Sequence, residues 1–205
     1  MAEIRIYCEG GNKGTNTKVA FREGMRKFLN ELFETAGEKR LKLFLTICGG
    51  RGDAYNDFKT ALKTHKDAIN ILLVDSEAPV SQTPWKHLKQ NDNWESLGSG
   101  DNQCHLMVQT TEAWILADPD ALATFYGQGF NANSLPKNRN VEQIDKPVLI
   151  KSLSNAIRQT NKPEYHKIHH GAKLLGLIAP IKVRQASEHC DRMFTTISSL
   201  INDAG

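Results

Sequence analysis

The sequence predicts an α/β protein whose mostly parallel, four-stranded sheet is flanked by helices and followed by a C-terminal helical addition. Short β-rich runs alternate with segments of helical periodicity, which is the pattern of βαβ units and a parallel sheet. One run, Ile69–Val74, is apolar at every position except Asn70, as expected of a strand buried on both faces. From residue 147 onward the periodicity is helical only, which places the addition after the sheet.

Five elements are expected before residue 76. The strand-like runs end in glycines or carboxylates, and apolar residues at helical spacing fill the segments between them. Asp53 is placed to cap the second helix. In chain order we expect a strand at Ile4–Cys8, a helix at Lys18–Phe33, a strand at Leu41–Cys48, a helix at Ala54–His65 and a strand at Ile69–Val74.

Residues 76–103 interrupt this alternation. Pro, Ser, Asn, Gln and Trp dominate the segment, so we expect a long flap with at most a short helix near Pro84–Gln90. The fourth strand is expected at His105–Gln109, and a helix follows from near Thr111.

The C-terminal third is predicted to be helical. Residues 127–145 have the character of a loop, and three helices are expected after it, at about 147–160, 168–178 and 187–202. The chain therefore divides into an α/β core over residues 1–126 and a second part over residues 127–205. We expect that second part to be a loop and a helical extension packed on the core.

The composition is that of a globular protein with a mild excess of positive charge. Lys and Arg number 26 against 23 Asp and Glu, which permits a polyanionic partner without requiring one. The four cysteines are scattered and give no sign of a disulfide framework or zinc ribbon. No apolar run approaches the ~20 residues of a membrane span, and no signal peptide is recognisable. We therefore expect a cytoplasmic protein that does not associate with membranes.

Carboxylates stand at the ends of three of the four expected strands. Glu9 follows the first strand, Asp75 and Glu77 follow the third, and Glu112 follows the fourth. In an open parallel sheet these ends meet at one edge, where like charges need a cation or shifted pKa values. Hard carboxylate oxygens suit Mg²⁺ or Mn²⁺. A lone carboxylate after a strand is usually a cap or a solvated residue, and Glu112 could simply favour a helix dipole. The coincidence of positions favours the metal site.

Basic residues accompany the same strand ends. The glycine-rich stretch after Glu9 lacks the spacing of a Walker A motif. With Lys13 and Lys18 it could still cradle a phosphate before a helix N-terminus, or it could be a tight turn. Arg51 follows the second strand, where it could neutralise a scissile phosphate or brace the acidic cluster.

A second basic segment lies at residues 162–173. It contains His166, Lys167 and His170, which we expect to contact nucleic acid, with Lys167 or His170 stabilising charge at the leaving oxygen. The alternative is a solvated helix start. The spacing of the two histidines would also suit zinc, but no acidic or cysteine neighbour supports that metal.

Several short motifs follow one another in a recognisable order. They are Tyr7-Cys8-Glu9-Gly10, Leu73-Val74-Asp75-Ser76-Glu77, Glu112-Ala113-Trp114 and Ala117-Asp118, with weaker ones at Cys48–Arg51, Pro84-Trp85, Tyr126–Phe130 and Tyr165-His166-Lys167. In order and spacing they resemble the Toprim domain. More narrowly, they resemble small bacterial Toprim proteins of the RloB-like type, akin to OLD-family nucleases. The resemblance spans about residues 4–195.

This resemblance implies a Mg²⁺-dependent endonuclease that hydrolyses phosphodiesters in DNA or in RNA such as tRNA. Glu9 matches the family's general acid/base or metal ligand, Asp75 its first metal-binding aspartate, and Glu112 an extra ligand of the OLD-like branch. Glu77 departs from the second aspartate by one methylene. Related proteins are often antiphage effectors encoded beside an ABC/AAA-type ATPase, so such a partner is expected, and a homodimer is compatible with the sequence.

The leading hypothesis is a nuclease in which water is activated between Glu9 and a metal at the acidic edge, with Arg51 and Lys167 as electrostatic helpers. The alternative is a catalytically silent Toprim-like module that binds a partner ATPase, which the Asp-Ser-Glu departure supports. A phosphotransfer enzyme that uses Asp75 is a third reading, but the Asp-x-Asp-x-Thr/Val pattern it needs is missing from the sequence.

Overall fold

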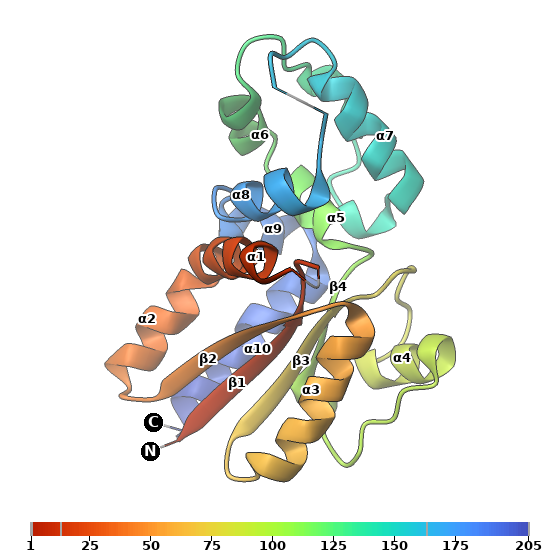
Figure 1. Ribbon diagram of the computed structural model, residues 1–205. Coiled ribbons are helices and arrows are strands. Elements are labelled where there is room, and N and C mark those ends of the chain that lie inside the picture. Colours follow the sequence, from red (N-terminus) through yellow and green to blue (C-terminus); the bar gives the residue numbers. More distant parts are fainter. Residues whose placement is uncertain (1, 13, 163, 205) are drawn as a thin grey trace.

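The computed structural model describes residues 2–12, 14–162 and 164–204. Four strands form one sheet in the order β2-β1-β3-β4, and every neighbouring pair is parallel, which confirms the predicted fold class (Figure 1). The strands are β1 (Glu3–Glu9), β2 (Lys42–Gly49), β3 (Ile69–Asp75) and β4 (Cys104–Met107), close to the positions expected from the sequence.

Helices cover both faces of this sheet. One face packs against α1 (Thr15–Phe28), α2 (Asn30–Glu38) and α10 (Glu188–Ala204), and the other against α3 (Arg51–Thr64) and α4 (Pro84–Asp92). Successive side chains of a strand point to opposite faces, so a sheet covered on both sides needs apolar residues at every position. This arrangement explains why the residues of β3 between Asn70 and Asp75 are apolar without alternation.

The remaining helices lie beyond the carboxyl ends of the strands (Figure 1). They are α5 (Thr111–Leu116), α6 (Pro119–Tyr126), α7 (Lys146–Ile157), a π-helical turn at Lys167–Gly171 that runs into α8 (Ala172–Leu175), and α9 (Pro180–Ala186). Short 3₁₀ turns occur at Asp101–Gln103, Ala132–Ser134 and Val141–Gln143. None of the helices in the described ranges combines the length and apolar composition of a bilayer span.

Some expected helix boundaries are wrong. The helix predicted at 18–33 is two helices that meet at Leu29, the one predicted from Thr111 is α5 and α6, and α9 was not expected. The helix predicted to start after Asp53 begins at Arg51, and Asp53 accepts the Gly50 N–H from its first turn. Apolar periodicity continues across each break because both helices cover the same core. Proline at the first position of α6 and α9 is the signal that marks these extra starts.

Candidate metal centre

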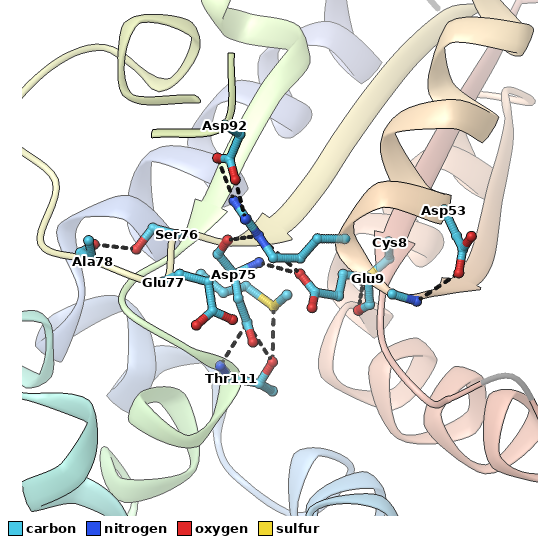
Figure 2. Close-up of polar contacts among 12 residues, drawn as sticks. Cys8, Glu9, Asp53, Asp75, Ser76, Glu77, Ala78, Asp92 and Thr111 are labelled. Atoms are coloured by element: carbon cyan, nitrogen blue, oxygen red, sulfur yellow. Dashed lines mark hydrogen bonds and ion pairs between the residues drawn. The ribbon is translucent and has the colours of Figure 1, made fainter. Parts of the chain in front are cut away.

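Glu9, Asp75 and Glu77 converge at the carboxyl edge of the sheet. Each offers one carboxylate oxygen, and the three oxygens lie within 4.8 Å of one another (Figure 2). The strands β1 and β3 are neighbours in the sheet, so residues at their ends are adjacent although they are remote in the sequence. This is the meeting of strand ends that a parallel sheet predicts.

Asp75 is the buried member of the group. Its Oδ1 accepts hydrogen bonds from both the backbone N–H of Thr111, at 2.9 Å, and the hydroxyl of Thr111, at 3.0 Å. Thr111 is the first residue of α5, so the start of that helix fixes the orientation of the carboxylate. The other oxygen, Oδ2, faces the ammonium group of Lys167 at 3.3 Å.

Glu9 stands at an irregularity in β1. The pairing with β2 shifts register between Cys8 and Glu9, and Glu9 Oε2 accepts the backbone N–H of Asp75 at 3.0 Å. The next residue, Gly10, has a φ of +153°, and a Cβ there would lie 2.2 Å from the ring of Phe21. Only glycine fits this position, and it allows the strand to end with Glu9 turned toward Asp75.

Glu77 reaches the group from a tight turn after β3. Its φ of +60° lies in the left-handed region, which residues other than glycine seldom adopt. Its N–H donates to the carbonyl of Gln109 at 2.9 Å, and its carboxylate pairs with Lys146 at the start of α7. The side chain is 40% exposed, so Glu77 can change partners without opening the core.

Glu112 lies next to this group rather than within it: among the described residues, the carboxylates within 4.8 Å of one another are those of Glu9, Asp75 and Glu77. The buried carboxylate of Glu112 accepts hydrogen bonds from the hydroxyls of Tyr165, at 3.1 Å, and of Thr110. Lys167 Nζ lies 3.4 Å from Glu112 Oε2 and 3.3 Å from Asp75 Oδ2. The ammonium group therefore stands between the two carboxylates.

Arg51 braces the acidic edge, which is one of its two expected roles. Its Nη1 and Nη2 donate to the carboxylate of Asp92 at 2.6 and 2.9 Å. Its Nε donates to the backbone carbonyl of Asp75 at 2.9 Å and lies 3.8 Å from Glu9 Oε2. With these partners the guanidinium group holds protein atoms, which favours bracing over phosphate binding.

A pocket of about 350 Å³ opens beside the carboxylates. His166 and Lys167 line it from the C-terminal part of the chain, opposite the loops that end β1 and β2. Those loops contribute four glycines, Gly10, Gly11, Gly49 and Gly50. Peptide groups without side chains, next to basic residues, are surroundings in which a phosphate can approach the backbone closely.

The other basic residues expected to contact nucleic acid are placed differently. Lys18 Nζ donates to the carbonyl of Cys48 at 2.7 Å, which ties α1 to the end of β2. His170 is buried among aromatic rings, and its Nδ1 accepts the N–H of His166 at 3.3 Å. Lys18 and His170 thus make structural contacts within the protein, and contact of either residue with nucleic acid stays a prediction. Lys13 lies outside the described residues.

Burial and charge shift the protonation of the site. Burial, and then the nearby charge of Asp75, raise the pKa of Glu9 to about 8. Burial also raises the pKa of Asp75, against the ammonium group of Lys167. Burial tends to raise the pKa of Glu112 as well. The charge of Lys167 and the hydrogen bonds that Glu112 accepts outweigh burial, so the pKa of Glu112 is lowered. Two adjacent carboxyl groups with raised pKa values are the state that a divalent cation would relieve.

Besides Thr110, Thr111 and Tyr165, three residues from helices packed around this site were not predicted. Asp92 holds Arg51, Lys146 pairs with Glu77, and His87 contacts the carbonyl of Ser76. Each is contributed by a helix packed against the edge from outside. The spacing of motifs in a single sequence does not reveal contacts between segments that are remote in that sequence. The sequence therefore contains no indication of these three residues.

Comparison with known proteins identifies the family of this chain. A family model described as "Domain of unknown function (DUF4276)" matches residues 17–198. The chain belongs to this family. The part matched to DUF4276 includes Asp75, Glu77 and Lys167, and it begins after Glu9. The family's description assigns no activity. No curated protein and no solved structure matches the chain.

Proposed function

We propose that this DUF4276 protein is a Mg²⁺- or Mn²⁺-dependent nuclease of the Toprim type, which hydrolyses phosphodiesters of DNA or RNA. The observation that carries the proposal is the group formed by Glu9, Asp75 and Glu77 beside a pocket lined by Lys167. Carboxylates that meet at the ends of parallel strands beside a pocket with a basic side chain are typical of metal-dependent phosphodiester chemistry.

The side chains at this edge fit a hard divalent cation. Carboxylate oxygens are the ligands that Mg²⁺ and Mn²⁺ prefer, and three of them within 4.8 Å are close enough to share one ion. Glu9, Asp75 and Glu77 would hold it. Such an ion polarises a phosphodiester and makes water more acidic.

Side chains at the site supply the other functions that hydrolysis requires: proton exchange, positive charge for the phosphate and a fixed position for Asp75. Glu9, with a pKa of about 8, can exchange a proton near neutral pH. The half-exposed ammonium group of Lys167 offers positive charge to a phosphate in the pocket. Arg51 keeps the backbone of Asp75 in place through its hydrogen bond to the carbonyl oxygen.

The order of the acidic residues supports the Toprim assignment. Glu9 ends one parallel strand, and Asp75 and Glu77 follow its neighbour, as in the motifs that the sequence resembles. The longer side chain of Glu77 is a departure from that pattern. By the same resemblance, we propose an ABC/AAA-type ATPase as partner and a role as an antiphage effector.

A catalytically silent module that binds a partner ATPase is the second candidate. Each carboxylate of the group already faces a cation of the chain: Arg51 near Glu9, Lys167 near Asp75, and Lys146 near Glu77. If these ion pairs persist in solution with a divalent metal present, the site has no need of a metal ion.

Incubation of the protein with plasmid, single-stranded DNA and tRNA tests the proposal. We expect cleavage with Mg²⁺ or Mn²⁺, none with EDTA, and a loss of roughly 100-fold or more in Glu9→Gln and Asp75→Asn. Glu38→Gln and Asp67→Asn are matched controls, because both side chains are exposed and lie away from the acidic edge, Glu38 at the end of α2 and Asp67 after α3.

Cleavage that persists in Glu9→Gln would remove the proposed mechanism. If no nucleic acid is cut with either metal, alone or with a partner ATPase and ATP, the binding module is the better account.

A further inference from the structure

The turn that carries two of the proposed metal ligands is held by consecutive backbone carbonyls. The carbonyl of Asp75 accepts a hydrogen bond from Arg51 Nε at 2.9 Å. The next carbonyl, that of Ser76, lies 3.0 Å from His87 Nε2. The peptide groups between Asp75 and Glu77 are therefore fixed by two side chains that do not themselves reach the pocket.

Ser76 has no polar group left unbonded. Its N–H donates to the carbonyl of Met107 at 3.0 Å, and its hydroxyl donates to the carbonyl of Ala78 at 2.6 Å (Figure 2). Both Ser76 and His87 are buried, so water cannot replace the imidazole if it is lost. The left-handed conformation of Glu77 follows directly after this carbonyl.

The contacts of His87 determine its tautomer. A carbonyl oxygen can only accept, so Nε2 must carry the hydrogen that it donates to Ser76. Asn91 Nδ2 lies 3.2 Å from Nε2 and 3.3 Å from Nδ1. With the hydrogen on Nε2, Nδ1 is the ring nitrogen that can accept from this amide. Asn91 also donates to the carbonyl of His87 at 3.1 Å, so the amide is oriented by two contacts.

Both side chains that hold the turn, Arg51 and His87, depend on the helix α4. His87 and Asn91 lie on α4, and so does Asp92, which binds the guanidinium group of Arg51 with both carboxylate oxygens. The helix is fixed in turn by Trp85, whose indole N–H donates to the carbonyl of Gly100 at 3.0 Å. The sequence suggested that residues 76–103 form a flap. In the structure, α4 within this segment supports the Asp75–Glu77 turn.

We propose that His87, oriented by Asn91, is a positioning residue for the metal ligands Asp75 and Glu77. This inference rests on the proposed function, because it assumes that those carboxylates bind a divalent cation. Residues that orient ligands in this way commonly change metal affinity by 10–100-fold when they are replaced.

Mn²⁺ titration of the full-length protein by calorimetry tests the inference. We expect His87→Leu to weaken Mn²⁺ binding by roughly 10-fold or more, because the unsatisfied carbonyl of Ser76 lets the turn rearrange. In His87→Gln the amide nitrogen takes the place of Nε2, and binding should stay within about threefold of wild type. His65→Leu, the same replacement at the end of α3, should leave affinity unchanged.

The comparison of variants separates positioning from general stability. All titrations are made well below the unfolding temperature of each variant, so a merely structural role would lower that temperature and leave the affinity in place. If His87→Leu does not fold, Asn91→Leu replaces it, since Asn91 is exposed and its loss frees the imidazole to rotate. A smaller weakening in the same direction is then expected, and an unchanged affinity overturns the inference.

The outcomes also distinguish this inference from the proposed function. If wild type binds no Mn²⁺, the metal site is refuted and the inference with it. If wild type binds Mn²⁺ and His87→Leu binds it equally well, or if His87→Gln is as weak as His87→Leu, the positioning role alone is refuted.

Discussion

The ammonium group of Lys167 lies 3.3 Å from Oδ2 of Asp75. It also lies 3.4 Å from Oε2 of Glu112, so one cation neutralises two carboxylates. The lysine side chain is 52% exposed, whereas the two carboxylate side chains are 1% and 2% exposed. A cation that can reach solvent thus neutralises two anions that cannot. In the ion-free protein this contact offsets the repulsion that a metal at Asp75 would otherwise relieve.

Replacing Lys167 with methionine should destabilise the protein in EDTA. Loss of one partner of a fully buried ion pair costs about 3–5 kcal/mol, but the exposure of this lysine reduces the expected loss to about 1–2 kcal/mol. Mn²⁺ should restore more stability to the variant than to wild type, because the ion supplies the missing charge. Urea unfolding with EDTA and with Mn²⁺ measures both effects.

Lys151→Met is the control for this variant, since Lys151 is exposed on α7. We expect it to change the unfolding free energy by less than about 0.5 kcal/mol. Equal unfolding of Lys167→Met and wild type in EDTA would show that the ammonium group does not neutralise the site.

The raised pKa of Glu9 predicts that the ion-free protein becomes less stable as pH rises. The folded state holds the Glu9 proton up to about pH 8, whereas an unfolded glutamate releases it near pH 4.3. The stabilising contribution is therefore complete below about pH 4 and is lost as pH rises through about 8. Glu9→Gln, which cannot ionise, should lose less stability than wild type between about pH 4 and pH 8 in EDTA.

The same proton competes with a metal ion. We expect Mn²⁺ affinity to rise with pH up to about 8, by as much as tenfold per pH unit, and then to level off. Calorimetric titrations at several pH values measure this slope, and Glu38→Gln should reproduce the wild-type curve. A Mn²⁺ affinity that is independent of pH would contradict the assignment of Glu9 as a ligand.

Much of the acidic edge could be predicted because two simple rules locate it. Hydrophobic runs mark the strands, and parallel strands bring their carboxyl ends together, so Glu9 and Asp75 needed no further information. The place of Glu112 next to the group could not be read from the sequence, because the direction of its side chain depends on how α5 leaves β4. There the carboxylate accepts hydrogen bonds from the hydroxyls of Thr110 and Tyr165, and it lies outside the 4.8 Å group.

Contacts made by remote helices could not be predicted in this way. Lys146 and His87 lie on amphipathic helices whose periodicity shows which face is buried but not what that face touches. Lys18 and His170 suggested a basic surface because a sequence shows charge without burial. In the fold one is bound to the carbonyl of Cys48 and the other is enclosed by aromatic rings.

Gly10→Ala should be strongly destabilising. The added Cβ would lie 2.2 Å from a ring atom of Phe21, which is buried, so the strand end or the ring must move. We expect a loss of roughly 2–4 kcal/mol by urea unfolding. Gly37→Ala is the matched control, since nothing lies within 4 Å of a Cβ there and the position is helical. It should be neutral or stabilise by up to about 1 kcal/mol.

Pairing Gly10→Ala with Phe21→Leu tests the cause of this loss. The smaller side chain makes room for the methyl group, so the double variant should be less destabilised than the sum of the single changes predicts. Simple additivity would mean that backbone conformation, rather than the contact with Phe21, restricts position 10.

Glu77→Gln and Glu112→Gln should separate the two acidic clusters. The carboxylate of Glu77 shares a 4.8 Å group with those of Glu9 and Asp75, whereas Glu112 binds Thr110, Tyr165 and Lys167. We therefore expect Glu77→Gln to weaken Mn²⁺ binding by roughly 10–100-fold with little change in stability.

Glu112→Gln should have the opposite effect: little change in Mn²⁺ affinity and a loss of stability. It leaves Lys167 with one carboxylate partner in place of two, so the lysine pairs more closely with Asp75 and Mn²⁺ affinity falls by no more than about threefold. Stability should fall instead, because hydrogen bonds to a buried charged acceptor contribute about 1.5–3 kcal/mol. If Glu112→Gln weakened Mn²⁺ binding as much as Glu77→Gln, the metal would lie between Asp75 and Glu112, in the place that Lys167 now occupies.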